Sequence, residues 1–140
     1  MPAAHATPTH DDLRLLARFE DGSLPREEFK HTAHLRVAWT LLATAPLPEA
    51  LTRFGAALRR LAAGFGQAEL YSETVTVFYM LVIHARRRDA PALDFAAFSA
   101  ANPDLFEPVR RFVGACYPPG ALDDPANKAS FLMPLHWPSC

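Results

Sequence analysis

Apolar residues recur along this chain at steps of three and four positions, which is the spacing of one face of an α-helix. The segment Leu70–Arg86 is apolar on almost every side, so we expect a helix there that lies at the centre of the fold. The fold class that this pattern predicts is all-α: a compact, single-domain bundle of about five to six helices. The expected helices cover residues 9–21, 25–44, 48–65, 70–86, 91–101 and 107–114.

Turn residues and prolines divide the chain outside these segments. Thr9 and Asp12 have the spacing of a capping box, so the first helix begins there and residues 1–8 are expected to form a flexible arm. Residues 9–140 then form one helical domain. Its last part, residues 117–140, reads as an irregular, proline-rich tail packed on the bundle, with one short turn at residues 125–129 followed by an extended apolar strip.

Composition narrows the class of protein. Half of the 140 residues are hydrophobic and the formal net charge is −1, which favours neither disorder nor a nucleic-acid partner. No apolar run is long enough to suggest a membrane partner, and the first residues lack the basic and apolar pattern of a leader. The two cysteines, Cys116 and Cys140, imply no disulfide framework. We therefore expect a cytoplasmic protein in which Cys116 is a reduced, buried residue.

The chemistry of the chain centres on His31 and His34. Residues three apart on a helix lie about 60° apart around its axis, so both imidazoles can face one small molecule or one ion. Steps of three and four from His31 also reach Leu35 and Ala38, which places both rings on the apolar face of their helix. Buried polar rings need partners, because burial without a hydrogen bond costs roughly 2–7 kcal/mol.

Glu73 is the carboxylate that we expect to meet this pair. It belongs to the apolar segment 70–86, where a carboxylate in mid-bundle would need a cation or a proton. Two histidines and one carboxylate are the ligands of mononuclear non-haem iron sites and of some zinc sites. The sequence thus predicts a mononuclear site between the second and fourth helices, with His31, His34 and Glu73 holding one divalent ion (iron, zinc or manganese).

Two other interpretations of the same residues stay open. In the first, the site is metal-free, one histidine is a general base and Glu73 orients it, as in an isomerase, lyase or cyclase. In the second, the residues form a structural network in a non-catalytic small-molecule-binding or assembly protein. The expected partner is a small-molecule substrate in either enzymatic case, and a homodimer is left open.

Neighbouring residues complete the predicted site. Tyr71 precedes Glu73 and is a candidate catalytic residue. Arg36 could attract an anionic substrate and Trp39 could stack on a flat one. Thr74 and Thr76 could donate hydrogen bonds to substrate oxygens, although helical threonines often bond to the preceding turn instead.

Four motifs resemble those of a known family. They are Phe-x-His-x-x-His-Leu-Arg-x-Ala-Trp at residues 29–39, Leu-Tyr-x-Glu-Thr-x-Thr at 70–76, Asn-Pro-Asp-Leu-Phe at 102–106 and Cys-Tyr-x-Pro-x-x-Leu at 116–122. Together they look like a family of small uncharacterised bacterial helical proteins, over residues 29 to about 125. The resemblance implies one compact functional module and brings no established activity. It also implies that a histidine often stands where this chain has Ser72.

Overall fold

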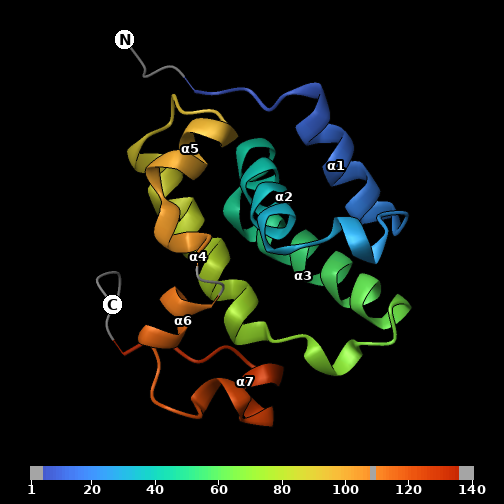
Figure 1. The fold of residues 1–140 in the computed structure, drawn as a ribbon, viewed down its shortest axis with the longest axis vertical. Coiled ribbons are helices and arrows are strands. Elements are labelled where there is room, and N and C mark those ends of the chain that lie inside the picture. The colour runs from blue at the N-terminus through green and yellow to red at the C-terminus, as the bar shows by residue number, and fades with distance from the viewer. Residues whose placement is uncertain (1–4, 108–109, 136–140) are drawn as a thin grey trace.

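The computed structural model describes residues 5–107 and 110–135, and in these ranges the chain folds as an all-α bundle without a β-strand (Figure 1). The predicted fold class is therefore confirmed. The α-helices of the described part are α1 (His10–Asp21), α2 (His31–Thr44), α3 (Leu47–Gly64), α4 (Glu73–Asp89), α5 (Phe95–Ala101), α6 (Arg111–Ala115) and α7 (Pro125–Ala129). The last of them is the short turn expected in the tail.

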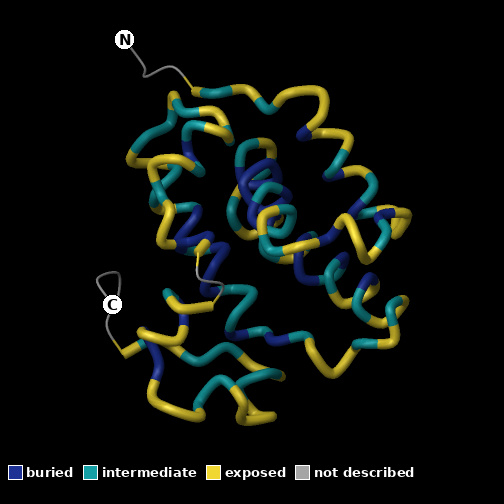
Figure 2. Tube along the Cα trace, in the orientation of Figure 1, coloured by how far each residue is buried: buried dark blue, intermediate teal, exposed yellow. Residues whose placement is uncertain are grey.

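The core is built around α2. This helix packs against α1, α3, α4 and α5, and its residues from Val37 to Leu42 are all buried. Figure 2 shows α2 as the darkest segment in the middle of the molecule. The sequence predicted that α4 lies at the centre of the fold. In the structure α6 and α7 pack against one side of α4, and neighbouring helices bury α4 less completely than α2. The fully apolar pattern of α4 reflects contacts with two layers, because α2 and α3 lie on one side and the tail on the other.

Four helices begin later than the sequence suggests: α2, α4, α5 and α6, of which the last two begin at Phe95 and Arg111 rather than at residues 91 and 107. Pro25 opens only a 3-10 turn, Arg26–Glu28, after which Phe29 and Lys30 leave helical geometry and α2 starts at His31. The fourth helix starts at Glu73 because the Ser72 hydroxyl accepts a hydrogen bond from the Val75 amide and caps it. At the first helix the prediction is confirmed, since Thr9 and Asp12 form the complete capping box.

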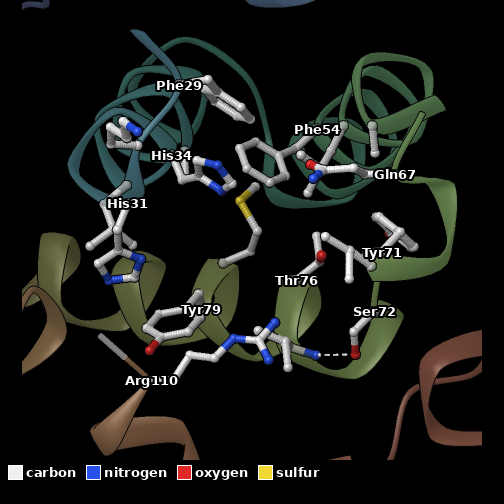
Figure 3. A pocket seen from close by; sticks show the side chains of 18 of the residues that line it. Phe29, His31, His34, Phe54, Gln67, Tyr71, Ser72, Thr76, Tyr79 and Arg110 are labelled. Atoms are coloured by element: carbon white, nitrogen blue, oxygen red, sulfur yellow. Dashed lines mark hydrogen bonds between the residues drawn. The ribbon is translucent and has the colours of Figure 1, made fainter. Parts of the chain in front are cut away.

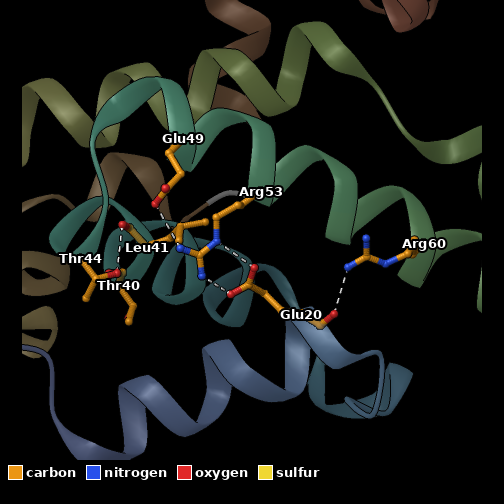
Figure 4. A network of polar contacts seen from close by, with 7 residues as sticks. All are labelled: Glu20, Thr40, Leu41, Thr44, Glu49, Arg53 and Arg60. Atoms are coloured by element: carbon orange, nitrogen blue, oxygen red, sulfur yellow. Dashed lines mark hydrogen bonds and ion pairs between the residues drawn. The ribbon is translucent and has the colours of Figure 1, made fainter.

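Polar contacts hold α1 against α3 (Figure 4). Arg53 donates to both carboxylate oxygens of Glu20, with Nε to Oε2 at 3.0 Å, and also contacts Glu49. Arg60 donates to the backbone carbonyl of Glu20 at 3.0 Å. Partly exposed ion pairs each contribute about 0–1 kcal/mol, so this network sets the alignment of the two helices more than their stability.

The tail lies on α4 as an extended segment. The buried Thr74 hydroxyl donates to the Ser130 carbonyl at 3.2 Å and accepts from the Leu132 amide at 2.9 Å. Tyr117 Oη donates to the Leu132 carbonyl at 2.7 Å, and the Leu135 amide donates to the Cys116 carbonyl at 2.8 Å. These contacts hold the backbone of the predicted strip on the chain's own helices as far as residue 135. Of its apolar side chains, Phe131 and Leu132 pack against the core, Met133 and Leu135 are exposed, and Trp137 lies outside the described residues.

Other terminal features differ from the sequence interpretation. Within the expected N-terminal arm, the Ala6 amide donates to the Pro91 carbonyl at 2.8 Å, and Ala6 packs against the core. Cys116 is fully buried, as expected, but it is disulfide-bonded, so the expectation of a reduced thiol is wrong. Among the residues described, no helix has the length and apolar character needed to cross a membrane.

Candidate functional site

A pocket of about 410 Å³ lies between α2, α3 and α4 (Figure 3). Its walls also include the turn before α2, the connection between α3 and α4, and Arg110 ahead of α6. The described lining residues are Arg26, Phe29, Lys30, His31, His34, Leu35, Ala38, Phe54, Leu58, Ala62, Phe65, Gln67, Leu70, Tyr71, Ser72, Val75, Thr76, Tyr79, Met80 and Arg110. Pockets of this size and mixed character are where proteins bind small organic molecules.

His34 faces this pocket from the first turn of α2. Its ring stacks on Phe29, with centroids 3.7 Å apart and an interplanar angle of 17°. Burial, with help from the neighbouring His31 and Arg110, lowers the pKa of His34 to about 4, while a contact with the Phe29 backbone acts in the opposite direction. The imidazole is therefore neutral near pH 7, when one ring nitrogen can accept a hydrogen bond or a proton.

His31 lines the same pocket as the first residue of α2. Its Nε2 lies 2.9 Å from the Leu105 carbonyl oxygen, and its ring meets Tyr79 edge-on with centroids 5.6 Å apart. A carbonyl only accepts, so Nε2 must carry the hydrogen in this contact. The Nδ1 atom is then the nitrogen left to accept a proton. The predicted pairing of the two imidazoles at one site is thus seen in the structure.

Glu73 is not brought to the histidines. As the first residue of α4, it accepts a hydrogen bond from Tyr71 Oη at 2.6 Å and an ion-pair contact from Arg59 at 3.3 Å. Its side chain is 28% exposed, whereas the sequence suggested mid-bundle burial. The reason is the late start of α4, since a carboxylate in the first turn of a helix is stabilised by the helix dipole. Glu73 is also absent from the described lining of the pocket.

Tyr71 connects this carboxylate to the pocket wall. Burial, reinforced by the hydrogen bond to Glu73, raises the pKa of Tyr71 to about 12, so the phenol stays protonated. The Arg59 guanidinium lies 4.7 Å from the centroid of its ring. Gly55 allows this close packing, because a Cβ at that position would lie 3.2 Å from Tyr71 Oη. Tyr71 therefore lines the site with its hydroxyl already engaged.

The predicted substrate-binding residues divide into two groups. Thr76 lines the pocket, whereas Arg36, Trp39 and Thr74 are not among its described lining residues. Arg36 Nε donates to the buried Asp12 at 2.6 Å, and Thr74 holds the tail. Trp39 is fully buried beside Phe95, and its Nε1 has no hydrogen-bond partner in the described part of the chain.

Metal-ligating side chains do not converge in the part of the chain that the structure describes. No three or more His, Cys, Asp or Glu residues lie close enough there to hold one ion. Of the three predicted ligands, His31 and Glu73 already have protein partners, and His34 is stacked on Phe29. The arrangement offers two imidazoles at one pocket rather than a three-ligand set.

Most residues that line the pocket were not predicted as site residues, among them Arg26, Lys30, Tyr79 and Arg110. Tyr79 lies three positions after Thr76 on the same face of α4, so helical spacing from a predicted site residue would have found it. Arg110 comes from a remote segment, and no local pattern in the sequence points to it.

Comparisons with family models, with curated proteins and with solved structures gave no match. The family resemblance suggested by the motifs therefore stays a prediction. In the structure Ser72, the position at which the resemblance implies a histidine, serves as the N-cap of α4 and lines the pocket.

Proposed function

We propose that this chain transforms a small organic molecule by metal-free acid–base chemistry in the pocket between α2, α3 and α4. The observation that carries the proposal is that His31 and His34 line one pocket from a single helical turn. Glu73 contacts Tyr71 and Arg59, so it neither completes a metal-ligand set nor orients a histidine base as the sequence suggested. The metal-free interpretation still fits best, because the Leu105 carbonyl contacts and orients His31 in place of Glu73.

The two imidazoles would have complementary roles. A neutral His34 accepts a proton from the substrate, and His31, whose ring is oriented by Leu105, accepts or returns one through Nδ1. Moving a proton between two substrate atoms is the chemistry of an isomerase, lyase or cyclase. Apolar walls around the rings exclude water and strengthen the electrostatic effect of each proton shift.

One observation favours a second candidate, a non-catalytic binding protein. Catalytic bases work best with a pKa near the operating pH, whereas burial lowers the pKa of His34 to about 4. An enzyme would need the bound substrate to raise this value, and a binding protein would not.

Proton abstraction can be measured without knowing the natural substrate. A panel of aryl-substituted ketones and 2-oxo acids is incubated with the protein in D₂O, and loss of the α-proton signal is followed by NMR. We expect accelerated exchange for the panel members that bind, with a loss of about a hundredfold in His34→Gln. His84→Gln, which alters a histidine of α4 outside the described pocket lining, should leave the rate unchanged. Binding without exchange for every member would contradict catalysis and support the binding protein.

Metal dependence gives a separate prediction. Because the described His and Glu side chains do not gather around one point, we expect dialysis against EDTA to leave the melting temperature and ligand binding unchanged. Elemental analysis of protein purified without a metal-affinity tag checks this. One iron, zinc or manganese per chain, lost in His34→Gln but kept in His84→Gln, would show instead that the ligand set predicted from the sequence is correct.

A further inference from the structure

The cations of the pocket have no acidic neighbours. Arg26, Lys30 and Arg110 line it, and neither Asp nor Glu occurs in its described lining. Within residues 5–107 and 110–135 none of these three forms an ion pair with a carboxylate. The arginines that do form ion pairs all lie outside the described lining: Arg18, Arg36, Arg53, Arg59 and Arg86. Positive charge therefore remains uncompensated at this pocket in a chain whose formal net charge is −1.

Arg110 is held there by an unusual backbone conformation. With φ of 66° and ψ of 0°, it is the one non-glycine residue of the described chain with a positive φ. Arginine adopts this left-handed region only when the surrounding structure holds it, and such residues are concentrated at functional sites. In Figure 3 its side chain runs past Tyr79 along α4, and the guanidinium points away from His31, toward the end of the pocket where Ser72 lies.

The charge of Arg110 reaches the interior of the site. Together with burial and with His31, Arg110 contributes to the lowered pKa of His34. Phe29 and Phe54 lie across the pocket from Arg110 in Figure 3, and Met80 adds a further apolar side chain to the lining. The pocket thus combines cationic side chains from two segments, the turn before α2 and Arg110, with an apolar interior, which is the complement of an amphipathic anion.

We propose that the pocket takes an organic anion with an apolar body, whose acidic head group is held by Arg110 beside Tyr79 while its body lies against Phe29, Phe54 and Met80. Arg26 and Lys30 add positive charge at the turn before α2. The inference rests on the proposed function, because it assumes that this pocket binds a small organic molecule. It extends that function by naming the chemical class of the ligand.

Two fluorescent probes that share one aromatic skeleton test separately whether the pocket binds a small organic molecule and whether it prefers an anion. The anionic probe is 1-anilinonaphthalene-8-sulfonate, and the uncharged one is N-phenyl-1-naphthylamine, which lacks only the sulfonate. We expect both to bind, the sulfonate more tightly, and Arg110→Gln to weaken only the sulfonate, by about tenfold. Arg111→Gln, a change at an exposed neighbour outside the described pocket lining, should alter neither affinity. Raising the salt concentration should weaken only the sulfonate in the wild-type protein.

Further variants locate the binding and test the role of the charge. Ala62→Trp fills the pocket from α3 and should abolish binding of both probes. Arg110→Lys keeps the charge and should retain most of the affinity for the sulfonate. If both probes bind equally and neither Arg110→Gln nor salt distinguishes them, the anion inference is overturned while the pocket stands. If neither probe binds, or Ala62→Trp has no effect, the proposed function fails together with it. Should Arg110→Gln fail to fold, the salt dependence and Arg26→Gln decide the question.

Discussion

Between pH 7 and pH 4 the free energy of unfolding is expected to fall by about 3 kcal/mol through His34 alone. The pKa of this histidine is about 4 in the folded chain, mainly because of burial, against an ordinary value of 6.5 for histidine. Between these values the unfolded chain binds more protons than the folded one, so stability rises with pH. The contribution is complete above the unfolded pKa and is lost as the pH falls through the window toward the folded pKa.

Denaturant unfolding of the wild-type protein and of His34→Gln at several pH values checks this result. The variant should lose most of the slope between pH 6.5 and pH 4, because glutamine does not titrate. Asp12, whose pKa is also lowered, contributes to both proteins at the acidic end and cancels in the difference. An identical slope in the two proteins would show that His34 is charged in the folded state. The other titratable groups that line the pocket are Arg26, Lys30, His31, Tyr71, Tyr79 and Arg110.

Bound anions should oppose this titration. Burial is the main cause of the lowered pKa of His34, and the charges of His31 and Arg110 add to it. A negative head group beside Arg110 offsets part of this positive charge and so raises the pKa of His34. The proposed ligand class and the proposed acid–base role are therefore connected, since the ligand itself brings His34 closer to the pKa of an effective base.

The sequence predicted the fold class and the histidine pair because both depend on local periodicity. The capping box at Thr9 and Asp12 and the shared face of His31 and His34 need only neighbouring residues and helical geometry. The start of α4 was placed too early, because the apolar pattern continues through Leu70 and Tyr71 although Ser72 caps the helix. That shift of three residues separates Glu73 from the predicted site.

Contacts between segments that are distant in the sequence could not be predicted from local periodicity. Arg110 enters the pocket through a left-handed backbone conformation for which the sequence has no glycine signal. Thr74 and Thr76 look equivalent in the sequence, yet their two-residue separation turns one toward the tail and the other toward the pocket. Knowing which face of α4 meets which neighbour requires the packing of the whole chain.

The second large expected effect is a loss of stability when Thr74 is replaced by valine, with the same replacement at Thr76 as the control. Thr74→Val keeps the shape of a fully buried side chain but removes both hydrogen bonds to the tail, at Ser130 and Leu132. Each tail group left without a partner costs about 1–3 kcal/mol, so we expect a loss of about 2–4 kcal/mol in the free energy of unfolding. Thr76→Val should change stability by less than about 0.5 kcal/mol, and hydrogen exchange at the Leu132 amide should quicken only in Thr74→Val.

Truncation after Lys128 extends the test from one hydroxyl to the whole strip. Phe131 and Leu132 pack against the core, so their removal should lower stability further. No described residue of the tail lines the pocket, and probe binding should therefore persist in the folded fraction. Met133 and Leu135 are 66% and 60% exposed, which is the surface an assembly protein would use. We expect sedimentation to show the same number of subunits before and after truncation. A truncated chain of unchanged stability but smaller assembly mass would show that the tail joins subunits rather than closing its own fold.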